Sequence, residues 1–343
     1  MNLSTPIISF IIPVYNGAAF IEAAYANILS QGITAIELIF IDNNSTDTSC
    51  TMIKNLQAKD ERVLLLQEKK QGAAAARNTG IKASKGQYVH FFDVDDTLYP
   101  NAILALRDVL DTRLEVMSVY GNTLRSYVPF EEAELPPETA GEIQVYDAPQ
   151  KGLLWFANKS IMVGPPAFLH RRTVFETIGV FPEHLLVGED ALFHVMLGLH
   201  CVVAHLDRYV YLYYRHADST VSKTNQNNVR NDKVFTYWPQ YIKGYLPYYY
   251  RKVLPEGYRL ELIKRIYGAM GRMLLKTPGF KARCALYSTL KVEIAPLKVP
   301  LLYRLFLIAI ICSHSVWVYK FYVFYILEPT LRFVRLPEKD QYL

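Results

Sequence analysis

The feature that most constrains the fold of this chain is the alternation of strand-like and helix-like segments along its first 120 residues. Short apolar runs rich in Ile, Val, Leu and Phe are separated by longer segments of helical character. Such alternation predicts a mostly parallel sheet flanked by helices, which is an α/β fold. The strand-like runs are residues 7–14, 36–41, 62–67, 87–92 and 115–120; the helix-like segments are residues 18–31, 48–59, 73–85 and a stretch opened by Pro100.

Polar residues follow several of the predicted strands. Asn16 comes after the first run, Asp42 after the second, and Asp93 and Asp95 after the fourth. Ligands of open α/β sheets bind outside the carboxyl ends of the strands. We therefore expect these side chains to line one binding site at that edge of the sheet.

The chain changes character along its length, which predicts two domains. Residues 1–242 carry a net charge of −6, whereas residues 243–343 carry +11 and are rich in tyrosine. A stretch rich in Pro and Glu, residues 125–150, is expected to be a surface loop. The predicted division is a catalytic domain at 1–222 and a helical, basic and aromatic region at 223–343.

The cysteines and the amino terminus point to a reducing compartment. The four cysteines are far apart and form no CxxC pair, which argues against a zinc site or a disulfide framework. No basic residue precedes the first apolar run, which is short and broken by Pro13, so we expect no signal peptide. A cytoplasmic protein is the resulting expectation.

The sequence FDVDDTLYP places Asp93, Asp95 and Asp96 within four residues. Carboxylates this close repel one another, and a cation is the usual remedy. Taken alone, the motif resembles that of haloacid-dehalogenase-type phosphatases, in which Asp93 would be the nucleophile, Asp95 the acid/base and Mg²⁺ the cofactor. That family usually carries the motif on its first strand, whereas strand-like runs already precede it here.

Several motifs read together give a different resemblance. They are FIIPVYNGAAFI, IFIDNNSTDTS, QGAAAARNTGIKASKGQYVHFFDVDD, GEDALF and YRHADSTVS, which occur in this order between residues 5 and 222. The set resembles the family 2 glycosyltransferases, an inverting group of GT-A fold that uses nucleotide-sugar donors. The resemblance implies a Rossmann-like central sheet and a donor that is a UDP-sugar. A nucleotide-sugar-binding protein without catalytic activity is the non-enzyme alternative.

The resemblance also implies which residues bind the donor. Asp42 would accept a hydrogen bond from uracil N3–H, which cytosine lacks. Asn44 stands where many relatives have glycine, in a loop that needs conformational freedom. Asp93 would contact the ribose, and Asp96 would orient the loop or the donor sugar. The remaining donor contacts would come from Pro13, Tyr15, Asn16, Arg77 and Asn78, the last two meeting the diphosphate or the base.

The metal and the catalytic base come from the same resemblance. Asp95 would bind Mn²⁺ or Mg²⁺, for which oxygen ligands and phosphates are suited, and His216 would add a ligand. Asp190 of the GED segment would be the general base that removes the acceptor proton. Glu189 would face the acceptor or cap a helix.

The carboxyl-terminal region predicts a membrane contact. Residues 305–319 are uncharged but contain serine and histidine and are shorter than the ~20 residues of a membrane span. A surface-lying helix pair within 299–327 fits better, with Trp and Tyr suited to the lipid–water boundary. A glycan or lipid-linked saccharide acceptor in bacterial surface polysaccharide assembly, at the inner face of the cell membrane, is the matching expectation. No nucleic-acid motif accompanies the basic charge, and a homo-oligomer is left open.

Overall fold

The computed structural model describes residues 6–137, 141–158, 161–185, 188–215, 244–245, 256–295, 297 and 299–327. The chain divides into two compact units, Met1–Lys223 and Thr224–Leu343.

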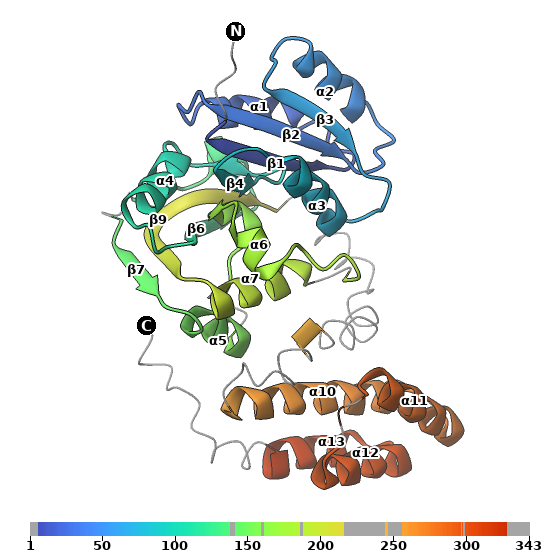
Figure 1. Ribbon diagram of the computed structural model, residues 1–343. Helices are drawn as coiled ribbons and strands as arrows, with labels where there is room; N and C mark the ends of the chain where they lie inside the picture. Colours follow the sequence, from blue (N-terminus) through green and yellow to red (C-terminus); the bar gives the residue numbers. More distant parts are fainter. Residues whose placement is uncertain are drawn as a thin grey trace. The chain divides into compact units, whose positions relative to one another are not determined.

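Over its described residues, the first unit is built on a nine-stranded mixed sheet with helices packed against it (Figure 1). The strand order is β3-β2-β1-β4-β8-β6-β9-β5, and β7 pairs with β9. Strands β3, β2, β1 and β4 are parallel, whereas β8 is antiparallel to both β4 and β6. The strands are β1 (Ile8–Val14), β2 (Ile36–Asp42), β3 (Val63–Gln67), β4 (Tyr88–Phe91), β5 (Thr97–Leu98), β6 (Ser118–Ser126), β7 (Ile143–Tyr146), β8 (Phe168–Arg171) and β9 (Val203–Tyr214).

The helices of this unit connect the strands of the parallel half and cover the sheet. Helix α3 packs against both β1 and β2, and it carries the residues of the predicted RN motif. The helices are α1 (Ile21–Leu29), α2 (Ser49–Gln57), α3 (Ala73–Ala83), α4 (Ala102–Thr112), α5 (Gln150–Ala157), α6 (Val174–Ile178) and α7 (Glu189–His200), with short 3₁₀ turns at Phe130–Glu132 and Pro165–Ala167.

The inner strands of the parallel half, β1, β2 and β4, are buried on both faces, as their continuous apolar runs require. In β1 every residue except Pro13 is buried. Helix α3 approaches this strand so closely that a Cβ on Gly80 would stand 2.3 Å from Cγ2 of Ile11. Only glycine fits at this contact, which fixes the position of α3 and of the side chains that it directs to the edge of the sheet.

The strand–helix alternation is confirmed in the parallel half. All five predicted strands form, as β1 to β4 and β6, and the predicted helices form as α1 to α4. The expectation of a loop over residues 125–150 is wrong in part, because β7 lies within it and pairs with β9. Strand β7 is only four residues long and half of its residues are exposed, so it lacks the apolar run by which the other strands were identified.

The second unit is helical over its described residues. Its helices are α10 (Glu256–Lys276), α11 (Phe280–Glu293), α12 (Leu301–Ser313) and α13 (Val316–Phe321), followed by a π-helical segment at Tyr322–Leu327. Helix α12 contacts the other three and buries Phe306, Leu307 and Ile310 completely. Over the described part of the chain, none of the helices combines the length and the apolar run needed to cross a membrane.

Candidate active site

The carboxyl ends of β1, β2 and β4 bring the predicted site residues to one edge of the sheet. Val14, the last residue of β1, pairs with Asp42, the last residue of β2. On the other side of β1, the backbone N–H of Phe92 donates to the carbonyl of Ile11 and leads β4 into Asp93. The structure therefore places the first three polar clusters beside one another, as parallel pairing predicts.

The loop after β1 is joined to the loop after β2 by hydrogen bonds. The side-chain oxygen of Asn16 accepts from the backbone N–H of Thr46 at 2.8 Å. The backbone N–H of Asn16 donates to Ser45 Oγ at 3.0 Å. Asp42 Oδ1 accepts from the N–H of Ser45 at 3.2 Å. Beside these bonds, Pro13 is half-buried and Tyr15 is 57% exposed, so the tyrosine ring is available to a ligand.

Asn44 takes the left-handed backbone conformation expected of glycine at this position. Its φ is +67°, and Asn tolerates this region better than most residues. Its amide nitrogen donates to the carbonyl of Lys69 at 3.0 Å and to Gln71 Oε1 at 3.2 Å. The loop geometry that glycine usually supplies is therefore available to this asparagine.

Asn43 is a structural residue of the site that the sequence motif did not single out. Its side chain is buried, and its Nδ2 donates to the carbonyls of Glu68 and Lys70 at 2.9 and 2.8 Å. Its Oδ1 accepts from the N–H of Gly72 at 2.7 Å. These bonds fix the loop before α3 against the loop after β2. The sequence shows the pair Asn43-Asn44, but no local pattern indicates that Asn43 joins two loops whereas Asn44 takes the left-handed backbone conformation.

Arg77 lies at the centre of the site. It extends from α3, its side chain is only 6% exposed, and Nη2 forms an ion pair with Asp93 Oδ1 at 2.8 Å. Nη1 lies 3.5 Å from Oε1 of Glu189, and the guanidinium also lies over the ring of Phe181. Burial alone would lower the pKa of Arg77. The nearby charges of Asp93, Glu189 and Asp190 have the larger effect, so the pKa of Arg77 is raised above its usual value.

Asn78 lies next to Arg77 but faces the protein interior. Its Nδ2 donates to the carbonyl of Phe181 and to Glu183 Oε1, both at 2.9 Å, and its Oδ1 accepts from the N–H of Phe181. The residue is 1% exposed. In this geometry Asn78 anchors the segment that follows α6, and the predicted donor contact stays a prediction.

The turn after β4 concentrates negative charge. Asp93 and Asp95 are half-buried, whereas Asp96 is buried and its Oδ1 accepts from the N–H of Tyr214 at 3.2 Å. Burial, together with the charges of Asp93 and Asp95, raises the pKa of Asp96 well above its usual value. Asp96 therefore ties the turn to β9, and its predicted role toward the donor sugar stays a prediction.

The GED segment opens helix α7 opposite this turn. Gly188 has a φ of +83°, and Asp190 Oδ1 accepts from the N–H of Ala191 at 2.7 Å, as acids at a helix start commonly do. Burial and the neighbouring Asp190 raise the pKa of Glu189 to about 7, although Arg77 acts in the opposite direction. Arg77 thus brings Glu189 and Asp93 together from distant parts of the chain.

The arrangement suits a divalent cation that is also held by a phosphate ligand. Five carboxyl groups interact electrostatically with one another or with Arg77, so oxygen ligands gather at this edge of the sheet: Asp93, Asp95, Asp96, Glu189 and Asp190. Within the described ranges, no group of three or more His, Cys, Asp or Glu side chains converges as a metal site. A metal here would need oxygens from a bound diphosphate and water, which is the common pattern for Mg²⁺. His216, the other predicted ligand, lies outside the described residues.

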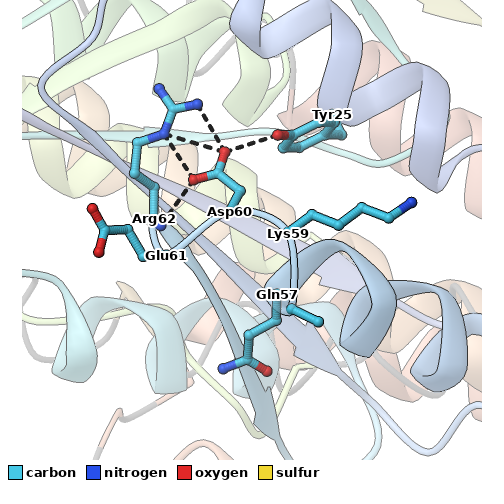
Figure 2. Close-up of a pocket in the computed structure, with 7 residues that line it drawn as sticks. Tyr25, Gln57, Lys59, Asp60, Glu61 and Arg62 are labelled. Carbon is cyan, nitrogen blue, oxygen red and sulfur yellow. Dashed lines mark hydrogen bonds and ion pairs between the residues drawn. The ribbon is translucent and has the colours of Figure 1, made fainter.

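A surface hollow of about 630 Å³ lies away from this site, at the amino end of β3 (Figure 2). In it the guanidinium of Arg62 and the hydroxyl of Tyr25 both bond to Asp60, at 2.7 and 2.8 Å. The Arg62 guanidinium lowers the pKa of Asp60 to about 2, despite partial burial of the carboxylate. These groups are already paired, and the polar residues of the strand ends lie at the opposite edge. We therefore place the candidate active site around Arg77.

Solved structures share this fold. The structure of S. aureus TarS residues 1–349 aligns with a TM-score of 0.60 and 15% identity, covering 96% of this chain and 92% of that one. The same protein in complex with UDP-GlcNAc aligns with a TM-score of 0.51 and 17% identity, over 84% and 88% of the two chains. The predicted GT-A class of α/β fold is thereby confirmed, together with a carboxyl-terminal helical region.

Sequence comparison identifies relatives that are described as glycosyltransferases. EpsJ of Bacillus subtilis, an uncharacterised glycosyltransferase, is 27% identical over 62% of this chain and 62% of its own length. The GalNAc(5)-diNAcBac-PP-undecaprenol beta-1,3-glucosyltransferase of Campylobacter jejuni is 30% identical over 53% of each chain. In both cases the match spans less than two thirds of the relative.

The family model described as glycosyl transferase family 2 matches residues 9–179. That range contains the parallel half of the sheet, the Arg77 motif and the carboxylates after β4. The chain therefore belongs to glycosyltransferase family 2.

Proposed function

We propose that this protein is an inverting, metal-dependent glycosyltransferase that transfers a sugar from a UDP-sugar to a glycan or lipid-linked saccharide in bacterial surface polysaccharide assembly. The observation that carries the proposal is the bridge made by Arg77 between Asp93 on the donor side and Glu189, the neighbour of Asp190. A donor diphosphate bound at the strand ends would then lie next to a carboxylate suited to accept a proton.

The donor would occupy the carboxyl edge of the parallel strands. Asp42 selects uracil by accepting a hydrogen bond from the N3–H of the base. Tyr15 and the loops fixed by Asn16 and Asn44 border the nucleotide. Asp93 holds the ribose, and Arg77 contributes positive charge beside the diphosphate. TarS, which shares the fold, has been solved in complex with UDP and with UDP-GlcNAc, which supports the choice of UDP-sugar.

The transfer itself is a displacement at the anomeric carbon. An acceptor hydroxyl oxygen attacks that carbon, and the bond from the carbon to the diphosphate oxygen breaks, so that UDP leaves. Asp190 takes the proton of the attacking hydroxyl, which makes it the general base. The transition state has oxocarbenium character, as in glycoside hydrolysis, and attack opposite the leaving group inverts the configuration.

The residues present fit a divalent ion. Mn²⁺ or Mg²⁺ bound through Asp95 would neutralise the departing diphosphate. Asp93 stays paired with Arg77 and keeps the donor ribose in register, while Asp96 holds the turn in place through Tyr214. His216 is proposed as a further ligand.

The acceptor is proposed to reach Asp190 from the α7 side, with Glu189 beside it. One relative is named for a PP-undecaprenol-linked saccharide, which supports a lipid-linked substrate. We propose that the protein meets this substrate at the inner face of the cell membrane. We propose residues 1–222 as the catalytic domain. The family assignment removes the phosphatase alternative, because Asp93 follows the fourth strand of a glycosyltransferase sheet rather than the first strand of a phosphatase.

The test is donor turnover. Purified protein is incubated with Mn²⁺ and a panel of UDP-sugars, with lipid-linked saccharides as acceptors, and both UDP release and the anomeric configuration of the product are measured. We expect UDP release that needs acceptor and metal, with inversion at the anomeric carbon. UDP binding without turnover of any donor would favour the non-catalytic binding protein instead.

A further inference from the structure

The second unit leaves an unusually apolar surface on α12 and on the segment that follows it. On α12, Leu301, Leu305 and Ile308 are 69%, 49% and 44% exposed. Their spacing of four and three residues places them on one stripe of the helix. The opposite side of α12 is also apolar but is buried, with Phe306 and Ile310 completely enclosed. A helix with an ordinary water-facing side would carry polar residues at the exposed positions.

The next segment repeats this pattern. Trp317, Phe321 and Phe324 are 80%, 55% and 56% exposed, again with spacings of four and three residues. Tyr319 and Tyr322 lie on the other side of the segment, where both rings contact Phe306 of α12. The exposed aromatic residues therefore point away from the packed interior of the unit.

The two stripes belong to neighbouring helices. Helices α12 and α13 contact each other, and both pack against α10 (Figure 1). The side chains left exposed on each helix are therefore not enclosed in the contacts with α10. We call Leu301, Leu305, Ile308, Trp317, Phe321 and Phe324 the apolar face.

The charges around the apolar face identify its partner. Residues 299–327 contain no Asp or Glu, and Arg304 and Lys320 are exposed beside the two stripes. Lys320 Nζ lies 5.6 Å from the centre of the Trp317 ring. Residues 256–327 together contain eleven Lys or Arg and three Asp or Glu. Apolar side chains with aromatic residues and flanking cations are the composition of helices that lie in the headgroup region of anionic membranes.

We propose that the apolar face inserts into the surface of an anionic lipid bilayer, with α12 and α13 lying parallel to the membrane plane. Arg304 and Lys320 would contact the lipid phosphates while the six apolar side chains enter the acyl boundary. This inference rests on the membrane location given with the proposed function, and it names the surface responsible. Insertion of this kind needs no membrane-crossing helix.

Vesicle flotation of the full chain tests the proposal without using sugar transfer. Wild type is mixed with vesicles of phosphatidylcholine alone or with 30% phosphatidylglycerol. We expect binding to the anionic vesicles that weakens in high salt. The variant Trp317→Glu/Phe321→Glu should bind roughly tenfold or more weakly, because it removes two aromatic anchors and adds two negative charges.

A matched control separates the apolar face from net charge. Phe280 and Val292 are 55% and 76% exposed on α11, so Phe280→Glu/Val292→Glu adds the same two charges elsewhere in the unit. This control should keep most of the binding. Equal losses in the two double variants would overturn the proposal, as would wild type that does not float or a face variant that floats like wild type. Thermal melting by circular dichroism shows that each variant is folded.

Light scattering measures the oligomeric state and so tests whether a second copy of the chain covers the apolar face instead of a membrane. If a second copy of this chain covers the apolar face, wild type will self-associate, the face variant will be monomeric and neither will bind vesicles, which would overturn the proposal. Vesicle flotation and UDP binding together distinguish failure of the membrane proposal from failure of the proposed function. A protein that floats but does not bind UDP would contradict the donor site alone, whereas one that binds UDP and does not float would contradict the membrane face alone.

Discussion

Arg77 and Asp93 form an ion pair of 2.8 Å between Nη2 and Oδ1, joining helix α3 to the turn that follows β4. The same guanidinium reaches Glu189 at the start of α7, with 3.5 Å between Nη1 and Oε1. Three segments that are distant in sequence are thus held by one buried side chain. In the proposed enzyme, this bridge sets the position of the donor-binding turn relative to the carboxylate beside the catalytic base.

Replacing Arg77 with lysine should disrupt this bridge while keeping the positive charge. A lysine amine cannot match the planar fork with which arginine meets two carboxylates at once. We expect kcat/KM to fall roughly 100-fold, as for other small displacements of catalytic groups. Steady-state kinetics measures the loss, and urea unfolding reports any change in stability. The control is Arg107→Lys, which alters an exposed pair with Asp111 and should leave both quantities nearly unchanged.

Asp190→Asn should separate chemistry from donor binding. Loss of a general base costs roughly 10²–10⁴-fold in rate, so kcat should fall by that factor while UDP affinity stays within about twofold. Glu189→Gln should have a smaller effect on kcat, since Glu189 is proposed to act on the acceptor side rather than as the base. An unchanged kcat in Asp190→Asn would mean that another group takes the proton.

The pKa of Glu189, raised to about 7, predicts a specific pH dependence of stability. The folded state holds this proton between about pH 4.5 and 7 while the unfolded chain has released it. The free energy of unfolding should therefore decrease as the pH rises through this window, by roughly 1–3 kcal/mol from this group. Urea unfolding with a chelator present, from pH 5 to pH 8, measures the slope. Glu189→Gln should remove this component, and an identical slope in wild type and variant would contradict the assignment.

Gly80→Ala tests the packing that positions Arg77. The added Cβ would stand 2.3 Å from Ile11, so α3 must shift away from β1. We expect a loss of roughly 1–3 kcal/mol in unfolding free energy, together with weaker UDP binding. Gly268→Ala in α10 is the matched control, because nothing lies within 4 Å of its added Cβ. Alanine favours the helical state, so this control should be neutral or stabilising by up to about 1 kcal/mol.

The parallel half of the sheet could be predicted from sequence because its signal is local. Each of β1 to β4 is an apolar run, and the residue types that follow them identify the binding edge. Strands β7 and β8 were not visible in this way. Strand β7 is short and half of its residues are exposed. Strand β8 is only four residues long and follows two prolines, although it forms buried core between β4 and β6.

The candidate site was predictable in its members but not in its contacts. The motifs pointed to Arg77, Asp93 and Glu189 separately, yet no local pattern shows that one guanidinium meets both carboxylates. The same limit applies to Asn43, whose four loop contacts depend on how two turns meet in space. Long-range pairing of this kind is set by packing, which spacing along the chain does not encode.

The proposed donor site is tested most directly by a calorimetric titration of UDP into the purified protein, with and without Mn²⁺, for wild type and Asp95→Asn. We predict that wild type binds UDP, that Mn²⁺ strengthens the binding and that the variant loses this metal-dependent gain. Asp95 is half-buried at the turn, so the substitution should leave the fold intact. Absence of UDP binding by folded wild type, with or without metal, would contradict the proposed donor site and the assignment of Asp42 to uracil.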